Sequence, residues 1–208
     1  MAGRSFGWRR SSPLRTRLLA ERSAVPPTVT GAAAFTAWLA ASVIVLSDGR
    51  RGLALGLALM AAALAPLAWI GGGWPAAAAV FAGGAMAAVQ RLRSGTDGWG
   101  LMPAGSTSRL ILVIAAGVLA LWISVSVTSG PAASIRFAAL VVIGLMGARM
   151  LAARDPAALM TAVAALALAI ATAAGLAATT PGLAPYMVAA LIAAGVSALR
   201  VSEKTHVV

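Results

Sequence analysis

The sequence predicts an all-α protein that crosses a membrane as a bundle of about seven helices. Of its 208 residues, 61% are hydrophobic and only 10% are charged, whereas about a quarter of a soluble domain is charged. The apolar runs are continuous and rich in Ala and Leu, which disfavours strands. Most are long enough to cross a hydrocarbon core of about 30 Å: they cover residues 28–47, 53–70, 75–89, 110–129, 132–148, 157–179 and 183–199.

The two ends of the chain differ from this transmembrane domain, which we place at residues 28–202. Residues 1–27 contain six arginines and no long apolar run. Ser12 followed by Pro13 is typical of a helix start, so we expect a basic N-terminal tail with an amphipathic surface helix. Residues 203–208 form a short polar tail.

The composition argues against several kinds of site. There are no cysteines and one histidine, His206, so disulfides and thiolate metal sites are excluded and one histidine cannot build a metal site alone. The predicted spans contain no Asp, Glu, Lys or His, and we expect neither an enzyme nor a bound cofactor. The net charge of +11 suits anionic lipids rather than nucleic acid, because the charges lie at the ends of apolar segments.

The loop charges predict the topology. Arginines occur in every second connection and near the C-terminus, whereas GGGWP (71–75), SGPAAS (129–134) and TTPGLAP (179–185) carry no charge. Positive residues mark the cytoplasmic side, so we expect the C-terminus in the cytoplasm of a bacterium. Seven spans then place the N-terminus outside, against the charge of its six arginines. The alternative is that segment 28–47 does not cross.

The sequence also contains a weak internal repeat. VIVLSDGRRGLALGLALM (43–60) and VIGLMGARMLAARDPAALM (142–160) each lead an apolar segment into a turn with arginines and an aspartate and then into another helix. Each is followed by a hairpin with Gly and Pro. Two three-helix units, joined by segment 110–129, describe this pattern.

The stretch ARMLAARDPAALMTAVAALAL (148–168) resembles the first turn and second helix of the small K subunit of complex I. In length and helix number, the chain is similar to the related E subunit of group 4 membrane-bound hydrogenases. The resemblance covers about residues 28–202. It implies a membrane subunit of a respiratory complex. The K-type family carries glutamates inside the membrane as part of a proton route, but segment 157–179 has no acidic residue, so the resemblance implies a lateral, structural subunit here.

A second resemblance competes with the first. QRLRSGTDGWGLMPAGSTSRLIL (90–112) is similar to the cytoplasmic loop of ABC-2-type export permeases, which implies a coupling helix that docks into an ATPase subunit. Such permeases usually place two spans before this loop, and three are counted here. If segments 53–70 and 75–89 formed one broken unit, the count would agree and the N-terminus would lie inside. A stand-alone transporter is the third alternative, disfavoured because no buried charge or broken helix marks a site at mid-membrane.

We therefore expect a non-catalytic structural subunit whose partners are other membrane subunits and anionic lipids. Charged or exposed residues at the loops are the candidate contacts with these partners. Arg136 is selected because it lies beside an otherwise neutral loop, and Trp99 because its loop is irregular. The candidates are Arg136, Arg91, Arg93, Trp99, Arg149, Arg154 and Asp155. Within this set, Arg149, Arg154 and Asp155 are expected to form one cytoplasmic turn between two spans.

Overall fold

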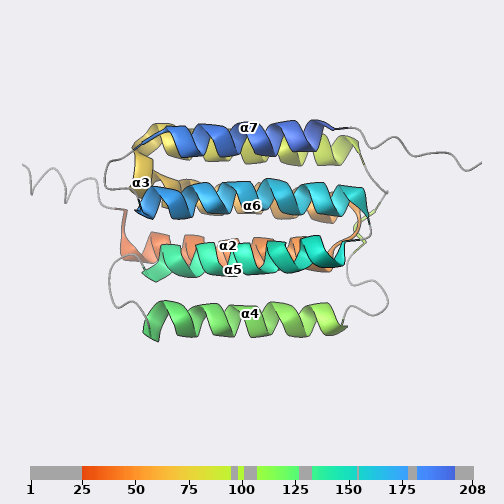
Figure 1. Cartoon of the computed structure of the whole chain (residues 1–208), viewed down its shortest axis with the longest axis horizontal. Coiled ribbons are helices and arrows are strands. Elements are labelled where there is room, and N and C mark those ends of the chain that lie inside the picture. Colours follow the sequence, from red (N-terminus) through yellow and green to blue (C-terminus); the bar gives the residue numbers. More distant parts are fainter. Residues whose placement is uncertain are drawn as a thin grey trace, which may run out of the picture.

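The computed structural model describes residues 25–94, 98–100, 107–126, 133–153, 155–177 and 182–199 (Figure 1). Within these ranges the chain forms helices and no β-strand, which confirms the all-α prediction. The helices are α2 (Pro27–Leu46), α3 (Arg50–Arg93), α4 (Thr107–Ser126), α5 (Ala133–Ala152), α6 (Pro156–Ala177) and α7 (Ala184–Ala198). The expected surface helix of the N-terminal tail and the polar tail 203–208 lie outside the described residues.

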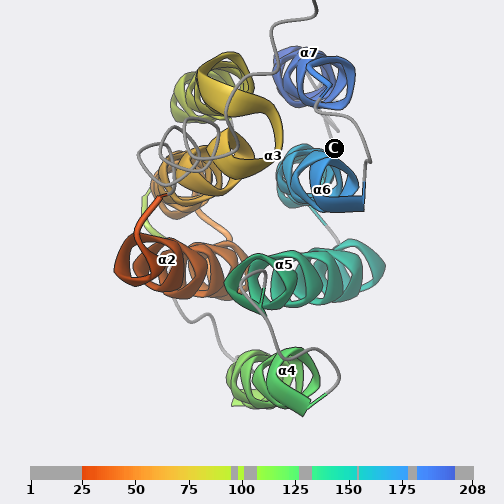
Figure 2. The same cartoon turned by 90° about the vertical axis from the view of Figure 1, so that its left-hand side faces the viewer.

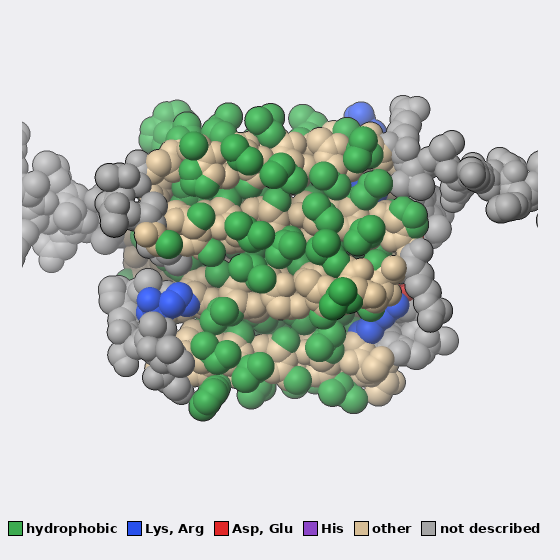
Figure 3. Space-filling model, in the orientation of Figure 1, with side chains coloured by type: hydrophobic (Ala, Val, Ile, Leu, Met, Phe, Trp, Pro, Cys, Tyr) green, Lys and Arg blue, Asp and Glu red, His purple; other side chains and the backbone are tan. Residues whose placement is uncertain are grey.

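Five of these six described helices, α2 to α6, are long and apolar enough to cross a membrane, whereas α7 has only 15 residues. The seven predicted spans are therefore not confirmed as such. Hydrophobic side chains cover the length of the helices, and Lys and Arg side chains gather near their ends (Figure 3). This distribution is that of a membrane-integral helical protein.

The 44-residue helix α3 doubles back on itself. A straight helix of that length would measure about 66 Å, roughly twice the hydrocarbon core. At Gly73 the backbone adopts φ 70° and ψ −168°, a conformation that is essentially restricted to glycine. The arms 50–72 and 74–93 therefore run antiparallel, and they correspond to the separate segments predicted at 53–70 and 75–89.

The helices form two rows with α4 outside them (Figure 2). One row contains α2 and the two arms of α3, and the other contains α5, α6 and α7. Close contacts bring the rows together: a Cβ added at Gly83 would lie 2.6 Å from Ala190 Cα, and Gly71 lies against the backbone of Gly175. Small residues at these points let the helix backbones approach closely.

The two ends of the bundle differ in charge. We call the end that contains the α2–α3 turn and the start of α6 the charged end. The end that contains Gly73, where Arg136 is the only charged side chain among the described residues, we call the uncharged end (Figure 1). α2 begins at the uncharged end, and α7 finishes at the charged end. Several arginines predicted to lie in connections are helical: Arg50 and Arg51 start α3, Arg91 and Arg93 end it, and Arg109 lies in the first turn of α4. The helices thus extend further than the apolar runs alone indicate.

Candidate interaction site at the charged end

The carboxylate of Asp48 is the centre of the charged end. Asp48 lies in the short turn between α2 and α3. One of its oxygens accepts a hydrogen bond from Arg149 Nη2 of α5, and Arg109 Nη1 of α4 donates to both oxygens at 3.1 and 3.0 Å. Arg149 also donates to the Ser47 carbonyl at 2.9 Å. A single carboxylate therefore fastens α4 and α5 to the α2–α3 turn.

The backbone of residues 98–100 packs on the same turn. The Asp48 amide donates to the Gly100 carbonyl at 3.0 Å, and the Arg51 amide donates to the Gly98 carbonyl at 3.2 Å. A Cβ added at Gly49 would lie 2.5 Å from the Gly98 oxygen, so only glycine fits there. We call Asp48, Arg109, Arg149 and residues 98–100 the Asp48 latch.

Within the Asp48 latch, the backbone of Trp99 is held in place. The Trp99 backbone lies against Gly49 and Gly52, while about half of the residue's surface stays exposed, at 49%. A large aromatic side chain held outward by an anchored backbone can contact another molecule with little loss of conformational entropy.

Arg91 and Asp155 provide a second electrostatic attraction between the rows. Arg91, at the end of α3, is only 2% exposed, and Asp155 attracts it electrostatically from the start of α6. Asp155 also caps α6, because its Oδ1 accepts a hydrogen bond from the Ala157 amide at 3.2 Å. Among the described residues, no hydrogen-bond acceptor meets Nε or Nη2 of Arg91. Arg91 is thus a buried cation whose main compensation is one nearby carboxylate.

The other predicted site residues lie elsewhere. Arg93 is exposed on the last turn of α3, and Arg136 is half-buried on the first turn of α5 at the uncharged end. Arg154 lies outside the described residues. The expectation that Arg149 belongs to one turn with Asp155 is wrong: Arg149 is 3% exposed within α5 and turns to Asp48.

Asp48 and Arg109, which form the ion pairs of the Asp48 latch together with Arg149, were not among the predicted site residues. The available signal was that Asp48 is one of only five acidic residues in the chain. A scarce carboxylate among many arginines at one end of an apolar bundle is the natural partner of whichever arginine is buried there. The choice of partner, however, depends on the packing of helices that are far apart in the sequence.

The surroundings of Asp48 set its pKa. Burial alone raises the pKa of the carboxyl, but the hydrogen bonds and positive charges of Arg149 and Arg109 outweigh burial and hold it below the ordinary value of 3.8. Asp48 therefore stays ionised as long as Arg149 and Arg109 are paired with it. Both oxygens accept hydrogen bonds from arginines, so this carboxylate is a poor candidate for a general base.

This lowered pKa predicts a loss of stability in acid. A carboxylate with a depressed folded-state pKa stabilises the protein fully above its unfolded pKa of about 3.9 and loses that contribution as the pH falls through the folded value. We expect the melting temperature of the detergent-solubilised protein to fall below about pH 4, and to fall less in an Asp48→Asn variant. Equal acid sensitivity in the two proteins would contradict the assignment.

The described residues of the site form ion pairs and backbone hydrogen bonds. Within the described ranges, no three His, Cys, Asp or Glu side chains come together in a way that could hold a metal ion. The ion pairs hold the ends of the helices together, and the partly exposed Trp99 lies beside them. Comparison with protein-family models, curated proteins and solved structures finds no match to this chain.

Proposed function

We propose that the chain is a non-catalytic, structural subunit of a larger membrane assembly and that α4 is the helix that contacts its partner. The observation that carries this proposal is the burial of α4. Only 17% of its most apolar stretch is buried inside the chain, compared with 44–56% for the other four candidate spans. α4 stands outside both rows and packs mainly against α5 (Figure 2).

The outward surface of α4 is large and apolar. Leu112, Leu119 and Trp122 are 40%, 55% and 63% exposed, and their spacing places them on one side of the helix. Helices associate in membranes through van der Waals packing rather than through a hydrophobic driving force. Because α4 packs so little inside its own chain, it offers an extended surface on which a helix of another membrane protein can pack.

The charged end supports a structural role. Asp48 belongs to the first predicted three-helix unit and is held by Arg149 of the second. Asp155 belongs to the second unit and attracts Arg91 of the first. These two acidic residues thus contribute to joining the two units. The host that we favour is a complex I-like or hydrogenase-like complex of the bacterial cytoplasmic membrane, with the charged end and the C-terminus in the cytoplasm.

The alternative of an ABC-2-type permease has less support. It requires a coupling helix within residues 90–109. α3 ends at Arg93 and α4 begins at Thr107, and the described residues between them, 94 and 98–100, are not helical. The backbone of residues 98–100 is engaged by the α2–α3 turn instead.

Site-specific photo-cross-linking in native membranes tests the proposal. A photoreactive amino acid at position 119 on α4 is expected to cross-link one membrane protein. The matched control is position 191 on α7, where the leucine is 69% exposed and lies on the far side of the bundle from α4 (Figure 2). We expect only lipid adducts there.

Mass spectrometry of the cross-linked product then distinguishes the hosts. Antiporter-like or hydrogenase subunits support the respiratory assembly, and an assembly with a Walker-motif ATPase replaces it with the permease. Lipid adducts alone at position 119, or the same protein at both positions, would refute α4 as the specific contact helix.

A further inference from the structure

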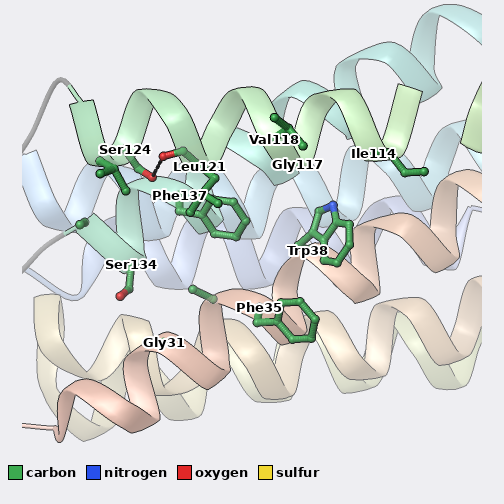
Figure 4. A pocket seen from close by; sticks show the side chains of 13 residues that line it. Gly31, Phe35, Trp38, Ile114, Gly117, Val118, Leu121, Ser124, Ser134 and Phe137 are labelled. Atoms are coloured by element: carbon green, nitrogen blue, oxygen red, sulfur yellow. Dashed lines mark hydrogen bonds between the residues drawn. The ribbon is translucent and has the colours of Figure 1, made fainter. Parts of the chain in front are cut away.

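An apolar groove lies between α2, α4 and α5 at the uncharged end, with a volume of about 480 Å³ (Figure 4). This volume is within the range of about 300–1,000 Å³ that is typical of sites for small molecules. The groove exists because α4 stands away from the rows. Side chains of α4 line one wall of the space that this leaves, and side chains of α2 and α5 line the others. Its walls include Phe35 and Trp38 of α2, Val118 and Leu121 of α4, and Phe137 of α5.

The walls of the groove suit a hydrocarbon chain. The ring of Trp38 packs against Gly117, and its Nε1 donates to the Val113 carbonyl at 3.3 Å. Ser124 Oγ, which also lines the groove, donates to the Leu121 carbonyl at 3.0 Å. These two polar groups are engaged within the protein, so an apolar occupant would not leave them without partners.

A positive charge lies beside this apolar groove. Arg136 is in the first turn of α5, between Ser134 and Phe137, which both line the groove. It is the only charged side chain among the described residues of the uncharged end. A half-buried arginine at a helix end places its guanidinium at the level of lipid headgroups, where its charge complements a phosphate.

From this combination we infer that the groove binds one anionic phospholipid, with an acyl chain along Phe35 and Phe137 and the headgroup phosphate at Arg136. A lipid fits better than a protein helix because the groove is bounded by three helices and is too small for a fourth. Arg136 does not line the groove, but it lies in the same helical turn as Ser134 and Phe137, which do, and its positive charge favours an anionic headgroup over a zwitterionic one. This site is separate from the outward face of α4 that we propose for a protein partner.

The groove can be filled without disturbing the fold. A Cβ added at Gly31, which lines the groove, meets nothing within 4 Å, so Gly31→Leu places a side chain in the acyl site. Gly195 of α7 has the same free space but lies away from the groove, which makes Gly195→Leu the matched control. Arg136→Gln removes the charge and leaves the groove open.

Native mass spectrometry of the full chain, titrated with phosphatidylglycerol or phosphatidylcholine of the same acyl chains, measures the binding. We expect one phosphatidylglycerol per chain in the wild type and in Gly195→Leu, and loss of this binding in Gly31→Leu. Arg136→Gln should weaken phosphatidylglycerol binding about fivefold and leave phosphatidylcholine unchanged.

Two results would overturn the inference. Unchanged phosphatidylglycerol binding in Gly31→Leu would show that the lipid does not occupy the groove. Equal binding of the two lipids by the wild type would show that Arg136 does not select the headgroup. Quenching of Trp38 by acyl-brominated phosphatidylglycerol, in a variant that retains only this tryptophan, places the chain in the groove independently, and absence of quenching would contradict the site.

Discussion

Replacing Asp48 with alanine is expected to destabilise the protein by about 3 kcal/mol, at the lower end of the range for stranding one partner of a buried ion pair. The cost arises mainly at Arg149, which is 3% exposed and would keep its charge without a carboxylate. The lower end applies because the Asp48 side chain is itself 37% exposed, so that water screens part of the interaction. Chemical or thermal unfolding in a mild detergent measures the effect.

The double variant Asp48→Ala with Arg149→Met separates the cost of a stranded charge from the loss of the contact. Methionine fills much of the same space without a charge, so we expect the double variant to recover most of the lost stability. Arg93→Ala, which removes an exposed arginine from the same end, is the control and should change little. If the double variant is as unstable as Asp48→Ala, the stability lost in Asp48→Ala does not come from the unpaired charge of Arg149.

Replacing Gly175 with alanine is expected to destabilise the protein, although alanine is the better helix former by up to about 1 kcal/mol. The added Cβ would overlap the hydroxyl oxygen of Tyr186, which is fully buried between Gly175 on α6 and Gly71 on α3. Overpacking of this kind costs about 1–3 kcal/mol. The free energy of unfolding in detergent should therefore fall by an amount in that range.

The control for this substitution is Gly144→Ala on α5, where an added Cβ meets nothing within 4 Å. It should leave stability unchanged or raise it. Tyr186→Phe should partly rescue Gly175→Ala, because it removes the overlapping oxygen while the ring carbon behind it stays close. If the two alanine variants have the same stability, Tyr186 does not fill the space between α3 and α6 as described.

The lengths and turns of the helices were largely predictable from local sequence. Each apolar run corresponds to a helix or an arm of α3, because burial of backbone polar groups in hydrocarbon leaves the helix as the simplest solution. The reversal at 71–75 was predicted from its glycines and Pro75, and the backbone of Gly73 shows why. The errors occurred at helix ends, where Arg91 and Arg149 lie within helices that extend beyond the predicted apolar runs.

The sequence did not indicate which charges at the charged end would meet. It selected Arg149 as a charge near a turn, but it gave no sign that Arg149 would pair with Asp48 and share that carboxylate with Arg109. Arg149 and Asp48 are 101 residues apart, and Arg109 and Asp48 are 61 apart. Local patterns carry no information about such distances, because pairing depends on how each helix is rotated and which neighbours it has.

The sequence by itself determined the class of the protein: an apolar, Ala-rich and Gly-rich chain forms membrane helices whose charges gather at their ends. Only the tertiary structure decided that α4 stands outside the two rows, which opens the groove beside Phe35. It also decided that Arg149 meets Asp48 and that Tyr186 fills the space between α6 and α3. The physical reason is that hydropathy sets where each helix lies along the membrane normal, whereas the side-chain shapes of distant residues set which helices are neighbours.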